Sequence, residues 1–229
     1  MSDKESEHGK RLFFDEHQWS SVEAAMARII PTDHEPGAKE AGTVVFVDRY
    51  LSGIDFIYAK PDGSGFEQLE GKRAEAWRQR IDIARGKYVE GIKDLDRRSR
   101  EQFGADFARL TDEQQDHVLA DMERPPQETE AAALQDVKTV SGYGAPVEPA
   151  LQQTSTEVEL DFFPLLALHT RQGFYADPIY GGNKDRVGWE VIRFPGPASL
   201  AEVHSGRYST LDYFAETRGH PEMEDGRGA

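Results

Sequence analysis

The chain has 229 residues, with 42 Asp and Glu against 27 Lys and Arg, a formal net charge of −15 and no cysteine. This acidic balance argues against binding to nucleic acid or to anionic lipid, because both rely on clustered basic residues. The lack of cysteine excludes disulfides, iron–sulfur clusters and Cys-ligated zinc, and the sequence has no run of about 18 apolar residues that would span a membrane.

The N-terminal residues 1–11 are polar, and we expect them to be disordered. They lack the apolar stretch of about 7–15 residues that marks a secretory signal. Asp15 followed by Gln18 forms a capping box, which predicts the start of a helix. Apolar residues then recur at helical spacing: Trp19, Val22, Met26, Ile29 and Ile30. Pro31 is expected to end this helix, because proline lacks the amide hydrogen that a helix interior needs.

The connector PTDHEPGAKEAG, residues 31–42, contains two prolines and two glycines, which predicts a shaped loop. The residues that follow, up to Leu51, fit one face of a helix except that Asp48 is polar. The β-branched residues in this stretch leave a strand open as the alternative. We favour the helix.

A turn is predicted at DGSG, residues 62–65. A long helix is predicted to follow, from about residue 66 to residue 100, because one apolar stripe recurs at helical spacing with charged residues on the other side. The stripe consists of Trp77, Ile81, Ala84, Tyr88, Ile92 and Leu95. A second capping box, Thr111 with Gln114, predicts a short amphipathic helix.

The segment 124–156 is rich in Pro, Glu, Gln and Thr, which indicates a loop-rich insertion. The segment after it, VELDFFPLLALHTRQGFY at 158–175, is apolar almost all round and predicts a buried helix. Pro164 fits its first turn, and Gly173 is expected to end or bend it.

Together these elements predict a mainly α protein: a compact, irregular helical domain of four to six helices with long shaped loops and little or no sheet. This single domain is expected to span residues 12–200 and to include the insertion. Residues 201–229 are expected to form a C-terminal extension that is partly mobile.

The most distinctive local sequence is Tyr180-Gly181-Gly182-Asn183. It matches neither the dinucleotide-binding pattern G-x-G-x-x-G nor the phosphate-binding pattern G-x-x-x-x-G-K-[ST]. Gly-Gly-Asn instead indicates positive φ angles or a backbone that another group approaches closely. The segment is therefore either a tight connector after the buried helix or a loop that recognises a partner.

The seven histidines form no metal-ligand pattern such as H-E-x-x-H. His34 has carboxylates on both sides, which leaves metal binding open, whereas His169 is expected to be a satisfied core residue. Glu157, Glu159 and Asp161 alternate in sequence and do not face one another on a helix, so we assign them to the helix dipole and to solvation. No catalytic, cofactor-binding or metal-ligating residues are predicted, which favours an accessory or binding role.

Two blocks of the sequence stand out as a pair. RIIPTDHEPGAKEAG occupies residues 28–42, with FVDRYL after it, and FFPLLALHTRQGFYADPIYGGNKDRVGWEVIRFPG occupies residues 162–196. Together they resemble the N-terminal and C-terminal blocks of the gluconate 2-dehydrogenase subunit 3 family. The long helix predicted between them fits the spacing expected for that family.

The resemblance implies a small, helical, non-catalytic subunit of a sugar dehydrogenase complex. The catalytic partner would be a large flavoprotein of the glucose–methanol–choline type that carries FAD and oxidises gluconate, glucose or a glycoside. A cytochrome c that carries haem c often forms a third subunit. The small subunit would support folding, flavin loading or export of the large one, and no cofactor is expected in this chain.

Many members of the family carry a twin-arginine export signal, and this sequence begins without one. We therefore expect either a cytoplasmic complex or export to the periplasm together with a signal-bearing partner.

The partner contact is expected at the rigid loops 31–42 and 177–196. The expected interface residues are Pro31, Asp33, Pro36, Gly37, Tyr180, Gly181, Gly182, Asn183, Trp189, Phe194 and Pro195. Whether Trp189 faces the partner or this protein's own core is left open. The alternative hypothesis is an independent small-molecule-binding protein or enzyme with a pocket near His169 and Asp177.

Overall fold

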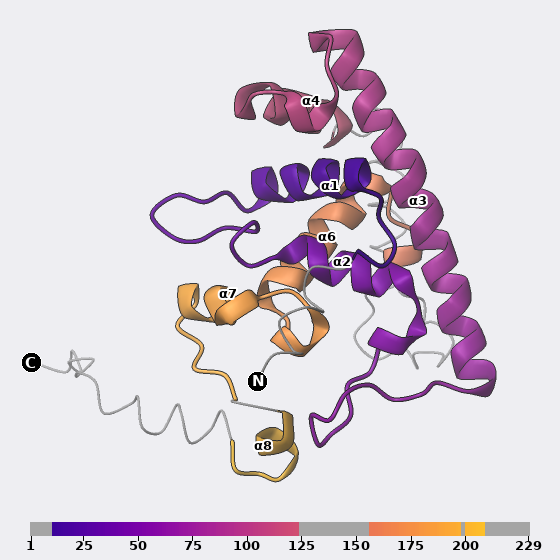
Figure 1. The fold of residues 1–229 in the computed structure, drawn as a ribbon, viewed down its shortest axis with the longest axis vertical. Coiled ribbons are helices and arrows are strands. Elements are labelled where there is room, and N and C mark those ends of the chain that lie inside the picture. Colours follow the sequence, from indigo (N-terminus) through magenta and orange to yellow (C-terminus); the bar gives the residue numbers. More distant parts are fainter. Residues whose placement is uncertain (1–10, 124–155, 198–199, 209–229) are drawn as a thin grey trace, which may run out of the picture.

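The computed structural model describes residues 11–123, 156–197 and 200–208 (Figure 1). In these ranges the regular secondary structure is helical, apart from one isolated bridge between Ala59 and Phe66, so the predicted mainly α class is confirmed. The α-helices are α1 (Glu16–Ile29), α2 (Thr43–Ser52), α3 (Gly71–Phe103), α4 (Asp112–Glu123), α6 (Phe162–Tyr175), α7 (Val187–Val191) and α8 (Leu200–His204). Short 3₁₀ turns occupy Ile54–Phe56, Phe107–Arg109, Thr156–Val158, Pro178–Tyr180 and Lys184–Arg186.

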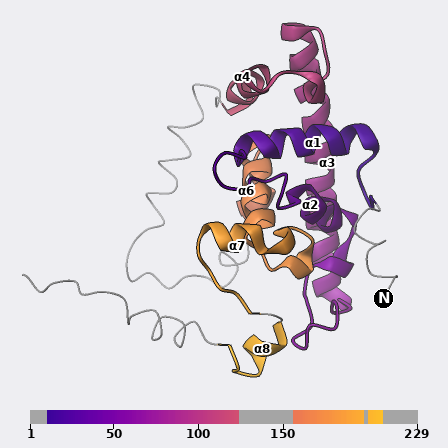
Figure 2. The same cartoon turned by 60° about the vertical axis from the view of Figure 1, so that its left-hand side comes forward.

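The 33-residue helix α3 forms a rod along one side of the molecule, and α1, α2 and α6 pack against it (Figures 1 and 2). The predicted stripe is confirmed, because Ile81, Ala84, Tyr88, Ile92 and Leu95 are all buried. Its first member, Trp77, is only half-buried. The stripe faces α6, whose Leu165 and Leu166 are fully buried. Each such leucine stabilises the fold by roughly 1.5–3 kcal/mol relative to an exposed position.

Both predicted capping boxes are present. The Asp15 side chain accepts the Gln18 amide hydrogen at 2.8 Å, and the Asp15 amide donates to Gln18 Oε1 at 3.1 Å. Thr111 and Gln114 exchange the corresponding bonds at the start of α4. These side chains satisfy backbone donors that have no partner inside the helix, and they therefore fix where α1 and α4 begin.

The segment for which a strand was the alternative forms the helix α2, as predicted. The polar residue on its apolar face, Asp48, has a structural role. Asp48 is 2% exposed. Its carboxylate accepts three backbone amide hydrogens, from Leu12 at 2.7 Å, Phe13 at 2.9 Å and Phe14 at 2.8 Å. A buried carboxylate needs such partners, and this one attaches residues 12–14 to the core.

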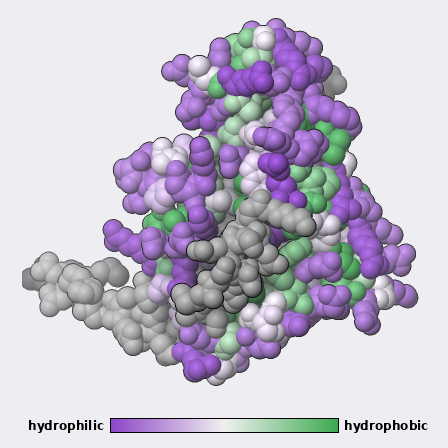
Figure 3. All heavy atoms as spheres, viewed as in Figure 1, coloured by the Kyte–Doolittle hydropathy of each residue, from purple (hydrophilic) through white to green (hydrophobic). Residues whose placement is uncertain are grey.

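Hydrophilic side chains cover most of the face shown in Figure 3, in keeping with a mean hydropathy of −0.67. Within the part of the chain that the structure describes, no helix is long and apolar enough to cross a bilayer. Most of three predicted regions lies outside the described residues: the N-terminus (1–11), the insertion (124–156) and the C-terminal extension (201–229). The predicted domain boundaries therefore stay predictions.

Candidate functional site

The two blocks that are far apart in the sequence meet on one face of the molecule. The Lys184 amide donates to the carbonyl of Ala41 at 2.9 Å, which joins the 31–42 loop to the 177–196 loop. A groove of about 860 Å³ runs between them. Its charged lining residues come from both blocks: Lys39, Glu40, Lys184, Asp185 and Arg186. We call the surface formed by residues 31–42 and 177–196 the two-block face.

Close backbone packing explains two glycines of the second block. A Cβ at Gly182 would lie 2.1 Å from the carbonyl oxygen of Gly173, and a Cβ at Gly188 would lie 1.9 Å from that of Phe174. Any larger residue at these positions would push the loop away from α6. Gly173 itself was expected to end or bend its helix, but α6 continues to Tyr175. Its lack of a side chain instead lets neighbouring backbone approach.

A run of left-handed backbone shapes the turn between these glycines. Asn183, Asp185 and Arg186 have φ angles of 48°, 55° and 65°, which residues other than glycine adopt rarely. Asn183 is fully buried. Its amide donates to the Ala176 carbonyl at 2.9 Å and its Oδ1 accepts from the Gly188 amide at 2.8 Å. The Asn183 side chain therefore ties both ends of the turn together.

Trp189 belongs to the core of this protein. The side chain is 6% exposed, and its indole N–H donates to the carbonyl of Tyr175 at 2.8 Å. Phe194 packs on it edge to face, with ring centroids 5.2 Å apart. A Cβ at Gly196 would lie 2.2 Å from the indole, so the chain closes tightly over the ring.

The expected interface residues therefore divide into two groups. Five are buried and serve internal packing: Gly37, Gly181, Gly182, Asn183 and Trp189. The other six are exposed or partly exposed: Pro31, Asp33, Pro36, Tyr180, Phe194 and Pro195. Of the expected residues, only the second group presents side chains that a partner could touch in this conformation, and the charged lining of the groove adds to it.

A buried polar network lies behind α2. His169 is fully buried, as expected for a core histidine. Its Nδ1 lies 2.9 Å from the hydroxyl of Tyr88, and its Nε2 lies 2.9 Å from the carboxylate of Glu157. The hydroxyl of Tyr50 donates to the same carboxylate oxygen at 2.6 Å. Every polar group in this cluster thus has a partner, as buried polar groups require.

Glu157 departs from the expectation that it would serve the helix dipole and solvation, because its side chain is only 13% exposed and is held by His169 and Tyr50. Burial on its own would raise the pKa of this carboxyl, but the hydrogen bonds from His169 and Tyr50 outweigh burial and lower that pKa below its usual value of 4.5. Burial and the nearby Glu157 carboxylate raise the pKa of both tyrosine hydroxyls, Tyr50 and Tyr88. An ionised Glu157 only accepts hydrogen bonds, so Nε2 of His169 donates to it.

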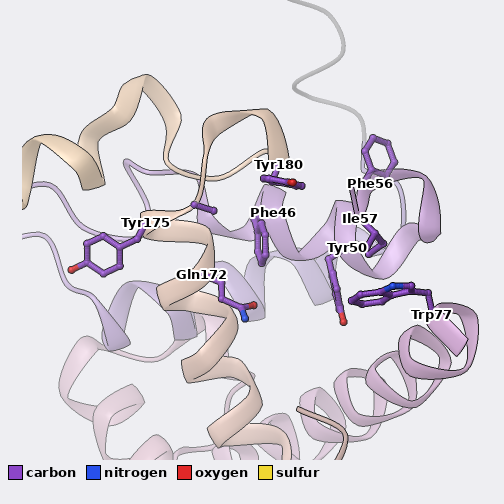
Figure 4. A pocket seen from close by; sticks show the side chains of 9 residues that line it. Phe46, Tyr50, Phe56, Ile57, Trp77, Gln172, Tyr175 and Tyr180 are labelled. Atoms are coloured by element: carbon purple, nitrogen blue, oxygen red, sulfur yellow. The ribbon is translucent and has the colours of Figure 1, made fainter. Parts of the chain in front are cut away.

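Tyr50, whose hydroxyl belongs to this network, also lines an apolar pocket of about 440 Å³ (Figure 4). Aromatic rings from α2, the 54–66 segment, α3, the end of α6 and the Pro178–Tyr180 turn line it: Phe46, Tyr50, Phe56, Trp77, Tyr175 and Tyr180. A pocket near His169 was part of the alternative hypothesis, but His169 itself does not line this one. Asp177, the other residue named there, caps the next turn by accepting the Ile179 amide hydrogen at 2.9 Å.

The network was not predicted as a site, and a pocket was predicted only in the alternative hypothesis, which placed it near His169 and Asp177. In the sequence, His169 was the one indication of the buried network, because a histidine on an apolar helix needs buried polar partners. Within the described ranges, no group of three or more His, Asp or Glu side chains is arranged to hold a metal ion. His34 is exposed and pairs with its neighbour Asp33 at 3.3 Å.

A family model described as gluconate 2-dehydrogenase subunit 3 matches residues 16–196. The matched range begins at the first residue of α1 and includes both blocks, the buried network and the aromatic pocket. A search of curated proteins and a search of solved structures each found no match.

Proposed function

The chain belongs to the gluconate 2-dehydrogenase subunit 3 family, and from this premise we propose that it is the non-catalytic accessory subunit of an FAD-dependent carbohydrate dehydrogenase. The family is described as a subunit, so its members act within a multi-subunit dehydrogenase complex. The finer part of the proposal is that this chain binds a large flavoprotein of the glucose–methanol–choline type. There it supports folding, flavin loading or export of that flavoprotein, which oxidises gluconate, glucose or a glycoside.

One observation supports this role most directly: the two blocks form a single, stiff, partly charged face. The Lys184–Ala41 hydrogen bond joins the two loops, and the close packing of Gly182 on Gly173 fixes the second loop on α6. A preorganised loop surface loses little conformational entropy when a partner docks, which favours affinity. The groove between the loops offers charged side chains of both signs for orienting the partner.

In this proposal the chain contributes no reacting group. The flavoprotein would supply FAD, and a cytochrome c with haem c would accept the electrons as a third subunit. The accessory subunit would act by covering a surface of the flavoprotein that is unstable when exposed. The flavin content of the large subunit therefore distinguishes two cases. A subunit that supports folding or flavin loading raises it, and a subunit that only binds leaves it unchanged.

The test is co-expression with the large flavoprotein subunit, followed by co-purification and measurement of bound flavin. Lys184→Glu reverses an exposed charge in the groove, and Lys72→Glu makes the same change in net charge at an exposed position in the first turn of α3. We expect Lys184→Glu to reduce co-purification and flavin content, and Lys72→Glu to leave both unchanged.

Two results would contradict the proposal in different ways. If the wild-type chain neither co-purifies with the flavoprotein nor changes its flavin content, the accessory role is wrong. If the wild type binds and both variants bind equally well, the subunit role stands and the groove is not part of the contact.

The second candidate is an independent small-molecule-binding protein or enzyme, and the aromatic pocket beside Tyr50 is the observation that favours it. Its volume of about 440 Å³ is within the range of small-ligand sites, roughly 300–1,000 Å³. Turnover of gluconate, glucose or a glycoside by the purified chain with an artificial electron acceptor would favour this candidate. Activity that requires the large subunit would favour the accessory role.

A further inference from the structure

We propose that the aromatic pocket receives an apolar side chain of the large dehydrogenase subunit, with a carboxylate of that subunit next to it. This inference rests on the proposed function, because it names the chemistry of the partner segment. It adds a second contact region to the two-block face.

The pocket has the form of an anchor site. Phe46 and Tyr50 project from α2, and Trp77 projects from α3, so two rigid helices hold three of its rings (Figure 4). Trp77 is further fixed by Tyr58, with ring centroids 5.8 Å apart and nearly perpendicular planes. Protein interfaces concentrate binding free energy where a large apolar side chain fills a preformed pocket.

The pocket adjoins the two-block face. Tyr180 belongs to the second block and lines the pocket, while its neighbour Gly181 lines the groove. On α2, Phe46 lines the pocket and the preceding residue, Val45, lines the groove. Because neighbouring residues line the groove and the pocket, a partner docked over the groove would also reach the pocket.

The charges around the pocket favour an acidic neighbour for the anchor. The guanidinium of Arg80 lies over the Trp77 ring, 4.3 Å from its centroid, and that of Arg49 lies over the Phe56 ring at 5.5 Å. Both rings line the pocket. Positive charge is thus held at the pocket wall of a chain whose net charge is −15, and an incoming carboxylate would be attracted there. The nearby carboxylate of Glu157 is hydrogen-bonded to Tyr50 and His169, and it also feels the charge of Arg80.

The polar groups of the pocket do not suit a ligand rich in hydroxyls. The hydroxyl of Tyr50 already donates to Glu157, and that of Tyr180 accepts the Ala59 amide hydrogen at 3.3 Å. The amide of Gln172, the hydroxyl of Tyr175 and the indole N–H of Trp77 are the other polar side-chain groups of a lining that is otherwise apolar. Binding sites for polar ligands need several well-placed hydrogen-bonding groups, so an apolar side chain fits this lining better than a sugar does.

The test fills the pocket from within and measures the affinity of the chain for the purified large subunit. Gln172→Trp places an indole at the exposed edge of the pocket without removing a buried side chain, and Arg171→Trp places the same indole one residue away, outside the pocket lining. We expect Gln172→Trp to raise Kd roughly thirty-fold or more, the loss typical of a blocked hot spot. Arg171→Trp should change Kd less than about twofold, and both variants should melt like the wild type.

If the wild type binds the large subunit and Gln172→Trp binds equally well, the pocket is not occupied by the partner and the inference is wrong, while the proposed function stands. If the wild type does not bind at all, the proposed function fails first.

The chemistry of the occupant is tested by placing the photocrosslinker benzoylphenylalanine at position 172 in the complex. The expected product joins it to a large-subunit peptide in which an apolar residue lies beside Asp or Glu. A crosslink to this chain itself, a partner peptide without a carboxylate, or a small molecule retained in the complex by native mass spectrometry would each overturn the inference.

Discussion

Gly182 packs against the backbone of Gly173 so closely that a Cβ on Gly182 would lie 2.1 Å from the Gly173 carbonyl oxygen. This contact joins the second loop of the two-block face to α6. Gly173 also faces α2, where a Cβ would lie 3.1 Å from the carbonyl oxygen of Thr43. Because Gly173 has no side chain, α6, α2 and the second loop can pack together at this point. The position of the two-block face depends on that packing.

Gly182→Ala should destabilise the isolated subunit, because the added methyl group would meet backbone that has no room to move. Overpacking of this kind costs about 1–3 kcal/mol, which corresponds to a fall in Tm of roughly 2–12 °C for a chain of this size. Gly86→Ala is the matched control: it is an exposed helix position with nothing within 4 Å of the added Cβ. It should stabilise by up to about 1 kcal/mol through helix propensity. Equal melting temperatures for the two variants would show that the close contact does not exist.

Trp189→Ala should unfold the subunit more easily rather than only weaken a partner contact. The indole is buried and donates to the Tyr175 carbonyl, and large-to-small changes at such sites cost about 3–5 kcal/mol. Ile192→Ala, at a residue that is 52% exposed on the neighbouring turn, should change stability by less than about 0.5 kcal/mol. Urea unfolding of the chain without its partner measures both. A stable Trp189→Ala subunit that fails to bind the flavoprotein would instead place Trp189 at the interface.

The helices could be read from the sequence because local chemistry specifies them. The capping boxes at Asp15 and Thr111 and the stripe that includes Tyr88 are short-range patterns, and each produced the predicted element. The pairing of the two blocks as a family signature was also visible. What no pattern disclosed was their contact, since the Lys184–Ala41 bond joins residues that only the fold brings together.

The roles of single polar residues were harder to predict. Asp48 was recognised as polar on an apolar face, but its partners are backbone amides on a segment 34 to 36 residues away. Glu157 lies 12 residues from His169 in a stretch that reads as solvated. A carboxylate looks the same in sequence whether it faces water or a buried histidine, so its role follows only from tertiary packing.

Asp48→Asn should detach the start of the described chain. The carboxylate accepts from Leu12 at one oxygen and from Phe13 and Phe14 at the other. An amide keeps only one acceptor atom. Leaving one buried amide hydrogen without a partner costs about 1–3 kcal/mol. Hydrogen exchange at residues 12–14 should become faster, and Asp55→Asn, at an exposed position, should leave those rates unchanged. Unaltered protection in Asp48→Asn would contradict the anchoring role.

The Glu157–His169–Tyr50 network should make stability depend on pH in acid. Burial opposes ionisation of Glu157, but hydrogen bonds from His169 and Tyr50 outweigh it and lower the folded-state pKa below 4.5. A carboxyl whose folded-state pKa is lowered contributes stability that is fully present above its unfolded-state pKa and is lost as the pH falls through its folded-state pKa. The stability advantage of the wild type over Glu157→Gln should therefore be constant between about pH 7 and pH 5.5 and should shrink below about pH 4.5.

The size of that advantage follows from the charge of the acceptor. Hydrogen bonds to a charged group contribute about 1.5–3 kcal/mol, against about 0.5–1.5 kcal/mol for neutral pairs. Glu157→Gln keeps an acceptor oxygen for Tyr50 and His169 but removes its charge, so we expect a loss of about 1–2 kcal/mol near neutral pH.

Glu159→Gln, an exposed neighbour, controls for the change in net charge and should show no such pH-dependent difference. Urea unfolding of all three proteins across the acid range is the measurement. A Glu157→Gln difference that stays constant down to about pH 3 would mean that folding does not change the pKa of the carboxyl, and a difference that grows as the pH falls would mean that the carboxyl is protonated in the folded chain. In the second case the carboxyl would donate to Nε2 of His169 and Nδ1 would donate to the hydroxyl of Tyr88, while the hydrogen bond from Tyr50 would keep its direction.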